Sequence, residues 1–415
     1  MSSSPPTPAT PSTPSGRAGT PRATSVLISG ASIAGPALAY WLDRYGFDVT
    51  VVERAPWLRP GGQPVDVRGA GLEVAERMGV AGAVRARRTG IRGVSIVDDE
   101  GAELFRSTER VATGEAVGGP DVEILRDELC EILFAAGGGA DGRIEYLFGD
   151  SIAALTQDED AVRVVFAGGA RRTFDVVVGA DGVHSATRRL AFGPEERCLH
   201  FLGSYLAVWT APNDLGLDRW QVVYRRPGSG TWGGMVMSVR DNAELRVFVG
   251  MEADEPPARS ARTEDHKRLV AAVYAGAGWE MPRLLERMWD APDFHFDSLA
   301  QIRMDSWSRG RVVLLGDAGY CGSPATGQGT TLAMVGAYVL AGELKAAGGD
   351  HRAAFAAYER RLRAYVTANQ DIAPANLKRL REGFTADPRE EDPFAITEDF
   401  MEVYAGLSDF PLPDY

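Results

Sequence analysis

A glycine-rich turn near the amino end has the composition of a phosphate-binding site. Residues 30–35 read GASIAG and follow a short apolar run, Ser25–Ser29. In a GxGxxG turn the glycines allow a tight bend, a close approach of pyrophosphate to the backbone, and packing of the next helix on the strand. Ser32 stands where the middle glycine would be, and its hydroxyl can itself bond a phosphate. The turn predicts a dinucleotide site formed by Gly30, Ala31, Ser32, Ile33 and Gly35.

An acidic residue follows at the distance that such a site requires. Residues 48–52 (DVTVV) form a second apolar run, and Glu53 ends it, about 20 residues beyond the turn. A carboxylate in this place accepts hydrogen bonds from the hydroxyls of a free ribose, as in FAD or NAD, and disfavours a 2′-phosphate. The alternative is an ordinary glycine-rich turn with a surface glutamate.

Two later strand ends carry similar acidic turns. Residues 179–185 read GADGVHS and contain Asp181, and the apolar run 312–315 leads into GDA, which contains Asp317. Pro324 and the sequence GQG at 327–329 then open a long helix. Aspartate and glycine are common in any turn, but a helix N-terminus of this kind can also stabilise the anionic edge of a reduced flavin.

The elements that position these turns belong to an α/β framework. Short apolar runs without alternation, such as 25–29 and 48–52, are typical of strands buried on both faces of a parallel sheet. The segment 36–45 between them predicts a helix, and a second helix is expected over 122–136 from the spacing of its apolar residues. From 204 to 250 the pattern changes to closely spaced strands, which predicts an inserted antiparallel sheet.

The bulk composition excludes several classes of function. A net charge of −13 argues against nucleic-acid binding, which needs clustered Lys and Arg. The three cysteines are far apart, and no metal-ligand spacing occurs, so neither a disulfide framework nor a zinc site is expected. No apolar run reaches bilayer-spanning length, and we expect a protein of the cytoplasm with no membrane partner. The first 24 residues are rich in Ser, Thr and Pro and predict a disordered tail.

The three turns, in this order and at these separations, resemble one family. They are similar to the signatures of the para-hydroxybenzoate hydroxylase type of FAD-dependent monooxygenase: a GxGxxG turn with a distal Glu, a DG motif and a GD motif. The resemblance covers residues 25–363. Within the family, the stretch Leu27–Met78, with VERAPWLRPGGQPVDVRG (52–69) in its middle, is similar to the tetracycline-inactivating monooxygenases and their actinobacterial relatives. The sequence departs from the family pattern at five positions: Ser32, Tyr320, Thr331, Ala333 and Gly336.

The resemblance implies a set of cofactor contacts. Glu53 and Arg54 would lie at the adenosine ribose of FAD, and Asp317 at the ribityl or pyrophosphate region. Asp181 would belong to the DG motif, which touches both FAD and the path of the nicotinamide. The remaining implied contacts are Asp66, Arg126, Pro324, Gly327, Gln328 and Gly329. The family has no separate nicotinamide domain, so NADPH or NADH would act as a transient reductant. Oxygen would then add at flavin C4a, and the resulting hydroperoxide would hydroxylate a small aromatic or polycyclic substrate.

The inserted sheet should roof the substrate pocket. We expect Gln221, Tyr224, Met235 and Met237 to line it, with Trp232 as a further candidate, although each could equally be plain core. No residue stands out as a general acid or base, which fits chemistry carried by a cofactor. Cys321 could be redox-active, but a packed small side chain is the simpler interpretation.

The expected organisation is a Rossmann-like FAD-binding domain (25–195 and 296–365), an inserted substrate domain (196–295), and a C-terminal helix and tail (366–415). Three other functions share this fold or cofactor. A flavin-dependent halogenase is disfavoured because its WxWxIP signature is absent. A FAD-dependent reductase or dehydrogenase, and a non-catalytic flavin-binding protein, stay open.

Overall fold

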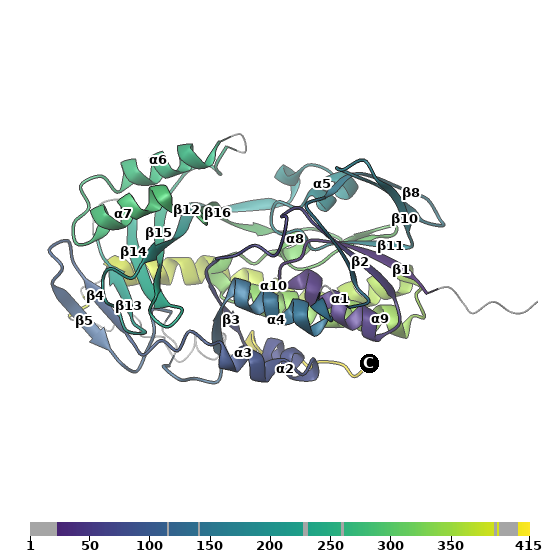
Figure 1. The fold of residues 1–415 in the computed structure, drawn as a ribbon, viewed down its shortest axis with the longest axis horizontal. Helices are drawn as coiled ribbons and strands as arrows, with labels where there is room; N and C mark the ends of the chain where they lie inside the picture. Colours follow the sequence, from purple (N-terminus) through teal and green to yellow (C-terminus); the bar gives the residue numbers. More distant parts are fainter. Residues whose placement is uncertain are drawn as a thin grey trace, which may run out of the picture.

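The computed structural model describes residues 23–113, 116–139, 142–226, 231–258, 261–385, 388–389 and 406–415, without the side chains of Trp232 and of residues 380–385. Figure 1 shows an elongated molecule with two parts. The predicted tail lies outside the described residues as far as 22, and so does part of the C-terminal tail.

The first part is built on a six-stranded sheet in the order β17-β18-β11-β1-β2-β7. The strands β18 (Val312–Leu314), β11 (Val176–Gly179), β1 (Ser25–Ser29), β2 (Asp48–Glu53) and β7 (Glu145–Phe148) are all parallel. Only the short edge strand β17 (Ser308–Arg309) runs antiparallel to its neighbour. Parallel strands are buried on both faces, which explains the continuous apolar runs in the sequence.

Different layers cover the two faces of this sheet. Val26 and Ile28 of β1 pack into a large cluster with α1 (Ala34–Arg44) and α9 (Gly329–Ala346). Leu27 points the other way, toward the three-stranded sheet of β8 (Ile152–Gln157), β9 (Val162–Phe166) and β10 (Arg171–Phe174). The long helix expected after 327–329 is confirmed as α9, and every residue over 330–344 is buried.

The second part is a seven-stranded sheet in the order β16-β12-β15-β14-β13-β4-β5. Its strands are β12 (Leu199–Pro212), β13 (Gln221–Tyr224), β14 (Thr231–Val239), β15 (Glu244–Glu252) and β16 (His295–Ile302), with β4 (Val94–Val97) and β5 (Glu103–Ser107). The helices α6 (Thr263–Val273) and α7 (Met281–Asp290) cover one face and form a second core.

Shorter elements connect the parts. They are β3 (Pro64–Val67), β6 (Val122–Leu125), α2 (Gly69–Arg77), α3 (Ala81–Ala86), α4 (Arg126–Ala136), α5 (Ala186–Phe192), α8 (Asp317–Tyr320) and the 3₁₀ turns Glu195–Arg197 and Pro324–Thr326. The longest helix, α10 (His351–Thr385), follows α9 and runs beneath both parts (Figure 1). None of the helices in the described ranges combines the length and apolar character needed to cross a bilayer.

The α/β fold class and the inserted antiparallel strands are confirmed, with two differences. The helix expected over 122–136 begins only at Arg126, because Val122–Leu125 pairs with β3 as a strand. The hairpin β4–β5, which the predicted boundaries leave in the first part, extends the second sheet by parallel pairing of β4 with β13.

The C-terminal residue Tyr415 packs against α9 at Gly342. The ring of Tyr415 lies where a side chain at Gly342 would stand, 2.1 Å from an added Cβ. Its hydroxyl donates to Oε1 of Glu343 (2.7 Å), and its ring packs against Tyr338 with 5.3 Å between centroids.

We predict that Tyr415→Ala lowers the free energy of unfolding by about 1–3 kcal/mol, because it removes an aromatic contact and leaves Glu343 with one bond fewer. Urea denaturation followed by far-UV circular dichroism measures this. Asp414→Ala is the matched control, since the Asp414 side chain is 99% exposed. Equal stability of the two variants would contradict the prediction.

Candidate active site

The three motif turns meet at one edge of the six-stranded sheet. They follow β1, β11 and β18, and parallel strands all end at the same edge. Gly30 has φ +109°, and a Cβ added to it would lie 2.4 Å from the carbonyl oxygen of Ala180. The Gly30 N–H donates to Val52 O and the Ala180 N–H donates to Ser29 O, both at 2.8 Å. The absence of a side chain at Gly30 therefore allows the first and second turns to touch.

The first turn leads directly into the amino end of α1. A Cβ at Gly35 would lie 1.9 Å from the carbonyl oxygen of Gly30, so glycine is required for this helix to start so close to the turn. No side chain caps α1, which leaves its first N–H groups and the positive end of its dipole for an anion. Ser32 lies beside this end, with its Oγ 3.5 Å from Sγ of Cys130.

The carboxylate of Glu53 faces the glycine turn. Its Oε2 accepts a hydrogen bond from Ala31 N and its Oε1 accepts one from Ala55 N, both at 2.9 Å. These two bonds fix the carboxylate at the end of β2, and each oxygen keeps a further acceptor site. Arg54, the next residue, is exposed.

A single large cavity joins the motif turns to the second sheet. Its volume is about 3260 Å³, well above the ~300–1,000 Å³ of a pocket for one drug-sized ligand. The predicted residues that line it are Gly30, Ser32, Ile33, Glu53, Arg54, Asp66, Arg126, Asp181, Asp317, Pro324, Gly327, Gly329, Gln221, Met235 and Met237. Ala31, Gly35 and Gln328 lie behind this lining layer.

The prediction for Tyr224 is wrong. Gln221 and Tyr224 are three residues apart on one strand, so they point to opposite faces of the sheet. Tyr224 is fully buried on the face covered by α6 and α7, where it stacks on Trp279 with 5.8 Å between ring centroids. Its hydroxyl donates to Oδ1 of Asp99. The side chain of Trp232 lies outside the described residues.

The second turn is held by its own aspartate. Oδ1 of Asp181 accepts from Ser185 Oγ, and Oδ2 accepts from the N–H and hydroxyl of Thr187 at 2.9 and 3.0 Å. Asp181 thereby binds the first turn of α5. The buried Arg188 of that helix donates to Ala318 O in the third turn (2.8 Å) and so connects the two turns.

Asp317 begins α8 at the bottom of the cavity, after Gly316 with φ +62°. Its side chain is exposed to the cavity, and the protein that surrounds it raises the pKa of its carboxyl group by desolvation, an effect partly offset by a hydrogen bond with Cys321. Burial also raises the pKa of the Cys321 thiol well above its ordinary value. A thiol in this state is a poor nucleophile, which favours the packing role for Cys321.

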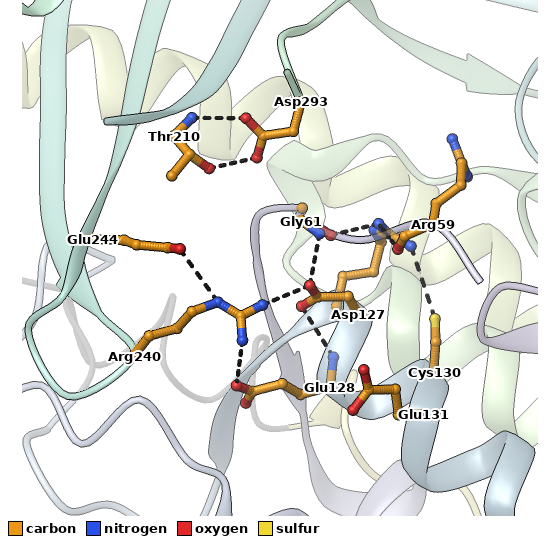
Figure 2. A network of polar contacts seen from close by, with 12 residues as sticks. Arg59, Gly61, Asp127, Glu128, Cys130, Glu131, Thr210, Arg240, Glu244 and Asp293 are labelled. Atoms are coloured by element: carbon orange, nitrogen blue, oxygen red, sulfur yellow. Dashed lines mark hydrogen bonds and ion pairs between the residues drawn. The ribbon is translucent and has the colours of Figure 1, made fainter. Parts of the chain in front are cut away.

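A polar network that the sequence did not indicate joins the two parts of the molecule (Figure 2). Arg126 Nη2 donates to Gly61 O (2.6 Å), and Oδ2 of Asp127 accepts from Gly61 N (2.6 Å). Arg240, on the turn between β14 and β15, forms ion pairs with Asp127 (2.6 Å), Glu128 (3.3 Å) and Glu244 (3.3 Å). These contacts fix the loop before β3 against both α4 and the second sheet. The predicted Asp66 lies in β3, directly after this loop.

A second network, at the wall of the cavity, centres on His184. Its Nδ1 lies 2.8 Å from Glu195 Oε1 and its Nε2 lies 3.1 Å from Asp297. The hydrogen bonds with Asp297 and Glu195 raise the pKa of His184 to about 9. Burial would raise the pKa of Asp297, but its bond to His184 brings that pKa below the ordinary value. Asp297 lies 113 residues from His184 in the sequence, so no local pattern reveals this contact.

The residues present fit a bound FAD. Glycine allows backbone approach at 30 and 35, a helix N-terminus without a side-chain cap lies behind the turn, and Glu53 lies at its side. The same cavity extends to Gly327 and Gly329 at the amino end of α9. In the described part of the chain no group of His, Cys, Asp and Glu is arranged to hold a metal ion.

Comparisons with known proteins agree with this geometry. Residues 23–378 match the model of a family described as FAD binding domain. The chain is 49% identical over 367 residues to an uncharacterized protein of Mycobacterium tuberculosis, covering 88% of this chain and 96% of the relative. It is 41% identical to a flavin-dependent monooxygenase from an unknown prokaryotic organism, covering 84% and 88% of the two chains. The crystal structure of the tetracycline destructase Tet(51) superposes with a TM-score of 0.83 at 33% identity, covering 95% of this chain and all of that one (100%).

The raised pKa of His184 makes stability depend on pH. Its folded-state pKa of about 9 exceeds the unfolded value of 6.5, so its contribution is full below pH ~6.5 and is lost as the pH rises through about 9. We predict that His184→Gln costs about 1–2 kcal/mol at pH 6, allowing for solvent screening, and almost nothing at pH 10. Urea denaturation across this range measures the gap. The exposed His200→Gln is the control, and a gap for His184→Gln that does not change with pH would contradict the assignment.

Proposed function

We propose, from the premise that this chain belongs to the FAD binding domain family and is a FAD-dependent monooxygenase, that it uses NADPH or NADH with O₂ to hydroxylate a small aromatic or polycyclic compound. The observation that carries the proposal is the continuous cavity. It runs from the glycine turn to the face of the second sheet that carries Gln221, Met235 and Met237, so one space can hold both a dinucleotide and a substrate.

Each residue predicted to contact the cofactor has a role in this proposal. Gly30, Ser32 and the amino end of α1 would bind the pyrophosphate, and Glu53 would accept from the ribose hydroxyls. Asp317 would bind the ribityl or pyrophosphate region, and Arg126 would contact the cofactor from α4. At the amino end of α9, the first backbone N–H groups of the helix, beginning at Gly329, would stabilise negative charge on the reduced ring, because the N–H groups of Gly327 and Gln328 already donate to Pro324 O and Thr326 Oγ1. Ala31, Gly35 and Gln328 would support these contacts from behind the cavity wall, while Ile33, Arg54, Asp66, Asp181 and Pro324 would add to its lining.

The chain's part in the reaction is binding, orientation and exclusion of water. FAD, reduced by the nicotinamide, supplies the oxygen-activating chemistry. Pro324, Leu299 and Phe248 border the cavity between the third turn and the second sheet, and apolar side chains there would keep bulk water from the reacting atoms. The division into domains is also part of the proposal. The FAD-binding domain would comprise 25–195 and 296–365, and the substrate domain 196–295 together with the hairpin β4–β5.

We predict that Gly35→Ala reduces FAD affinity by at least about tenfold, because its Cβ would displace the Gly30 carbonyl and distort the pyrophosphate turn. Fluorescence titration of the apoprotein with FAD measures this. Gly406→Ala is the control, since an added Cβ there meets no atom within 4 Å. Unchanged affinity in Gly35→Ala would remove the turn from the proposed site.

The proposed reaction is tested with the FAD-loaded protein. NADPH and NADH oxidation and O₂ uptake are recorded across phenolic and polycyclic compounds, with a tetracycline included because of the similarity to Tet(51). We expect one compound to accelerate both and to gain one oxygen atom by mass. A compound that is reduced without gaining oxygen would favour a reductase, and bound FAD without any stimulated turnover would favour a flavin-binding accessory protein.

A further inference from the structure

The antiparallel ribbon of β3 and β6 forms part of the cavity wall. Val67 pairs with Val122 in this ribbon, and both valines belong to the main core. Residues next to them along each strand point to the opposite face. The register that pairs the valines places Arg68 opposite Asp121. Four charged residues on this opposite face line the cavity: Asp66, Arg68, Asp121 and Glu123.

The ribbon lies against the amino end of α9. The N–H of Arg68 donates to Oγ1 of Thr331 (3.3 Å), and the Thr331 hydroxyl donates to Arg68 O (3.4 Å). Thr331 is in the first turn of α9, which begins at Gly329, and Gly329 itself lines the cavity. The charged face of the ribbon therefore borders the part of the cavity that the proposed function assigns to the flavin ring.

The charges of this face are compensated to different degrees. Arg68 Nη2 forms an ion pair with Asp66 (2.7 Å). The carboxylate of Asp121 accepts a hydrogen bond from the N–H of Gly69 and is attracted by Arg68, while Asp66 repels it. Glu123 lies opposite Asp66, one pair further along the ribbon from the contact with α9. Asp121 therefore adds a negative charge close to α9 that its neighbours compensate only in part.

Burial strengthens the effect of this charge. Desolvation raises the pKa of the Asp121 carboxyl group, and the charge of Arg68 and the hydrogen bond from Gly69 offset only part of that rise. The surroundings that make the charged form costly also screen its field weakly. A carboxylate in this position acts more strongly on a charge inside the cavity than an exposed carboxylate would.

A charge beside a flavin ring changes how readily the ring is reduced. A ring that takes up two electrons and one proton gains one unit of negative charge. The positive end of the α9 dipole favours this gain, and a carboxylate on the neighbouring wall opposes it. Charge close to the ring is one of the means by which a protein adjusts the electronics of its cofactor.

We propose that Asp121 tunes the cofactor: its carboxylate lowers the reduction potential of FAD bound in the cavity and so offsets the effect of the α9 amino end. This inference rests on the proposed function, which places the flavin ring at that helix end. A lower potential makes the reduced cofactor a stronger reductant toward O₂, the reactant that follows the nicotinamide. Asp121 acts through its charge on the ring and is a positioning residue for that charge.

The test measures the potential of the bound flavin without any substrate. The FAD-loaded protein is reduced slowly without oxygen at pH 8, in equilibrium with a reference dye of known potential, and the absorbance of both is followed. We expect Asp121→Asn to raise the midpoint potential by about 30 mV or more, which is a tenfold change in the ratio of reduced to oxidised flavin for a two-electron couple. Asp121→Glu keeps the charge and should stay near the potential of the unaltered protein.

Asp290→Asn is the matched control, because Asp290 ends α7 in the second part of the molecule and also lines the cavity. It removes the same charge from another wall and should leave the potential nearly unchanged. The proposal is overturned if Asp121→Asn leaves the potential unchanged, or if Asp121→Glu shifts it as much as Asp121→Asn does. Loss of FAD from Asp121→Asn would also overturn it, since the residue would then hold the cofactor and not tune it. Absence of FAD binding by the unaltered protein would overturn the proposed function as well, whereas an unchanged potential overturns this inference alone.

Discussion

The close approach of two backbone turns is the constraint on which the site depends. The space where Gly30 lacks a side chain is occupied by the carbonyl of Ala180, so the turns after β1 and β11 lie in contact. Gly35 in turn lets α1 start against the Gly30 carbonyl. A larger residue at position 30 would separate the glycine turn from the DG turn, and one at position 35 would push α1 away from the Gly30 carbonyl. Arg188 then connects the DG turn to the GD turn through Ala318, so the three motifs behave as one unit at the edge of the parallel sheet.

The second sheet is attached to this unit by charged contacts to one loop. From α4, Arg126 donates to the carbonyl of Gly61 and Asp127 accepts from the Gly61 N–H, while Arg246 of β15 donates to the carbonyl of Gly62. The cofactor side and the substrate side thus share a loop whose glycines leave no room for side chains: a Cβ at Gly61 would meet Asp293 and one at Gly62 would meet Arg126. The same residue, Arg246, belongs both to this junction and to the cavity wall.

Local pattern was sufficient for much of the fold and for the motif turns. Strands β1 and β2, the turn between them and the start of α9 at Gly329 follow from apolar runs and glycine positions. The sequence pattern assigns Val122–Leu125 to the helix that follows, because a short apolar run fits both the helical and the strand periodicity. Only its pairing with β3 shows that it is a strand. The hairpin β4–β5 joins the second sheet from a segment that is distant in the sequence, and no local pattern predicts this pairing.

The site residues also divide into those that a local pattern predicts and those that only the tertiary structure shows. Glycines and strand-end acids are visible in sequence because their backbone role is local. The face of Tyr224, the network of His184 and the position of Arg246 in its sheet depend on strand register and on partners more than 20 residues away, such as Asp297 for His184. Burial and register are tertiary properties, so the sequence could name Gln221 and Met237 as candidates but could not show that Arg246 lies between Met237 and Thr210.

Titration of the apoprotein with FAD and with FMN, followed by flavin fluorescence, tests most directly whether these joined turns hold a dinucleotide. FMN lacks the adenosine and one phosphate, so it cannot use Glu53 or the full glycine turn. FAD should bind with one molecule per chain and at least about a hundredfold more tightly than FMN, a difference of about 2.7 kcal/mol. Equal affinities, or binding of neither flavin, would contradict the assignment of the turns to the cofactor.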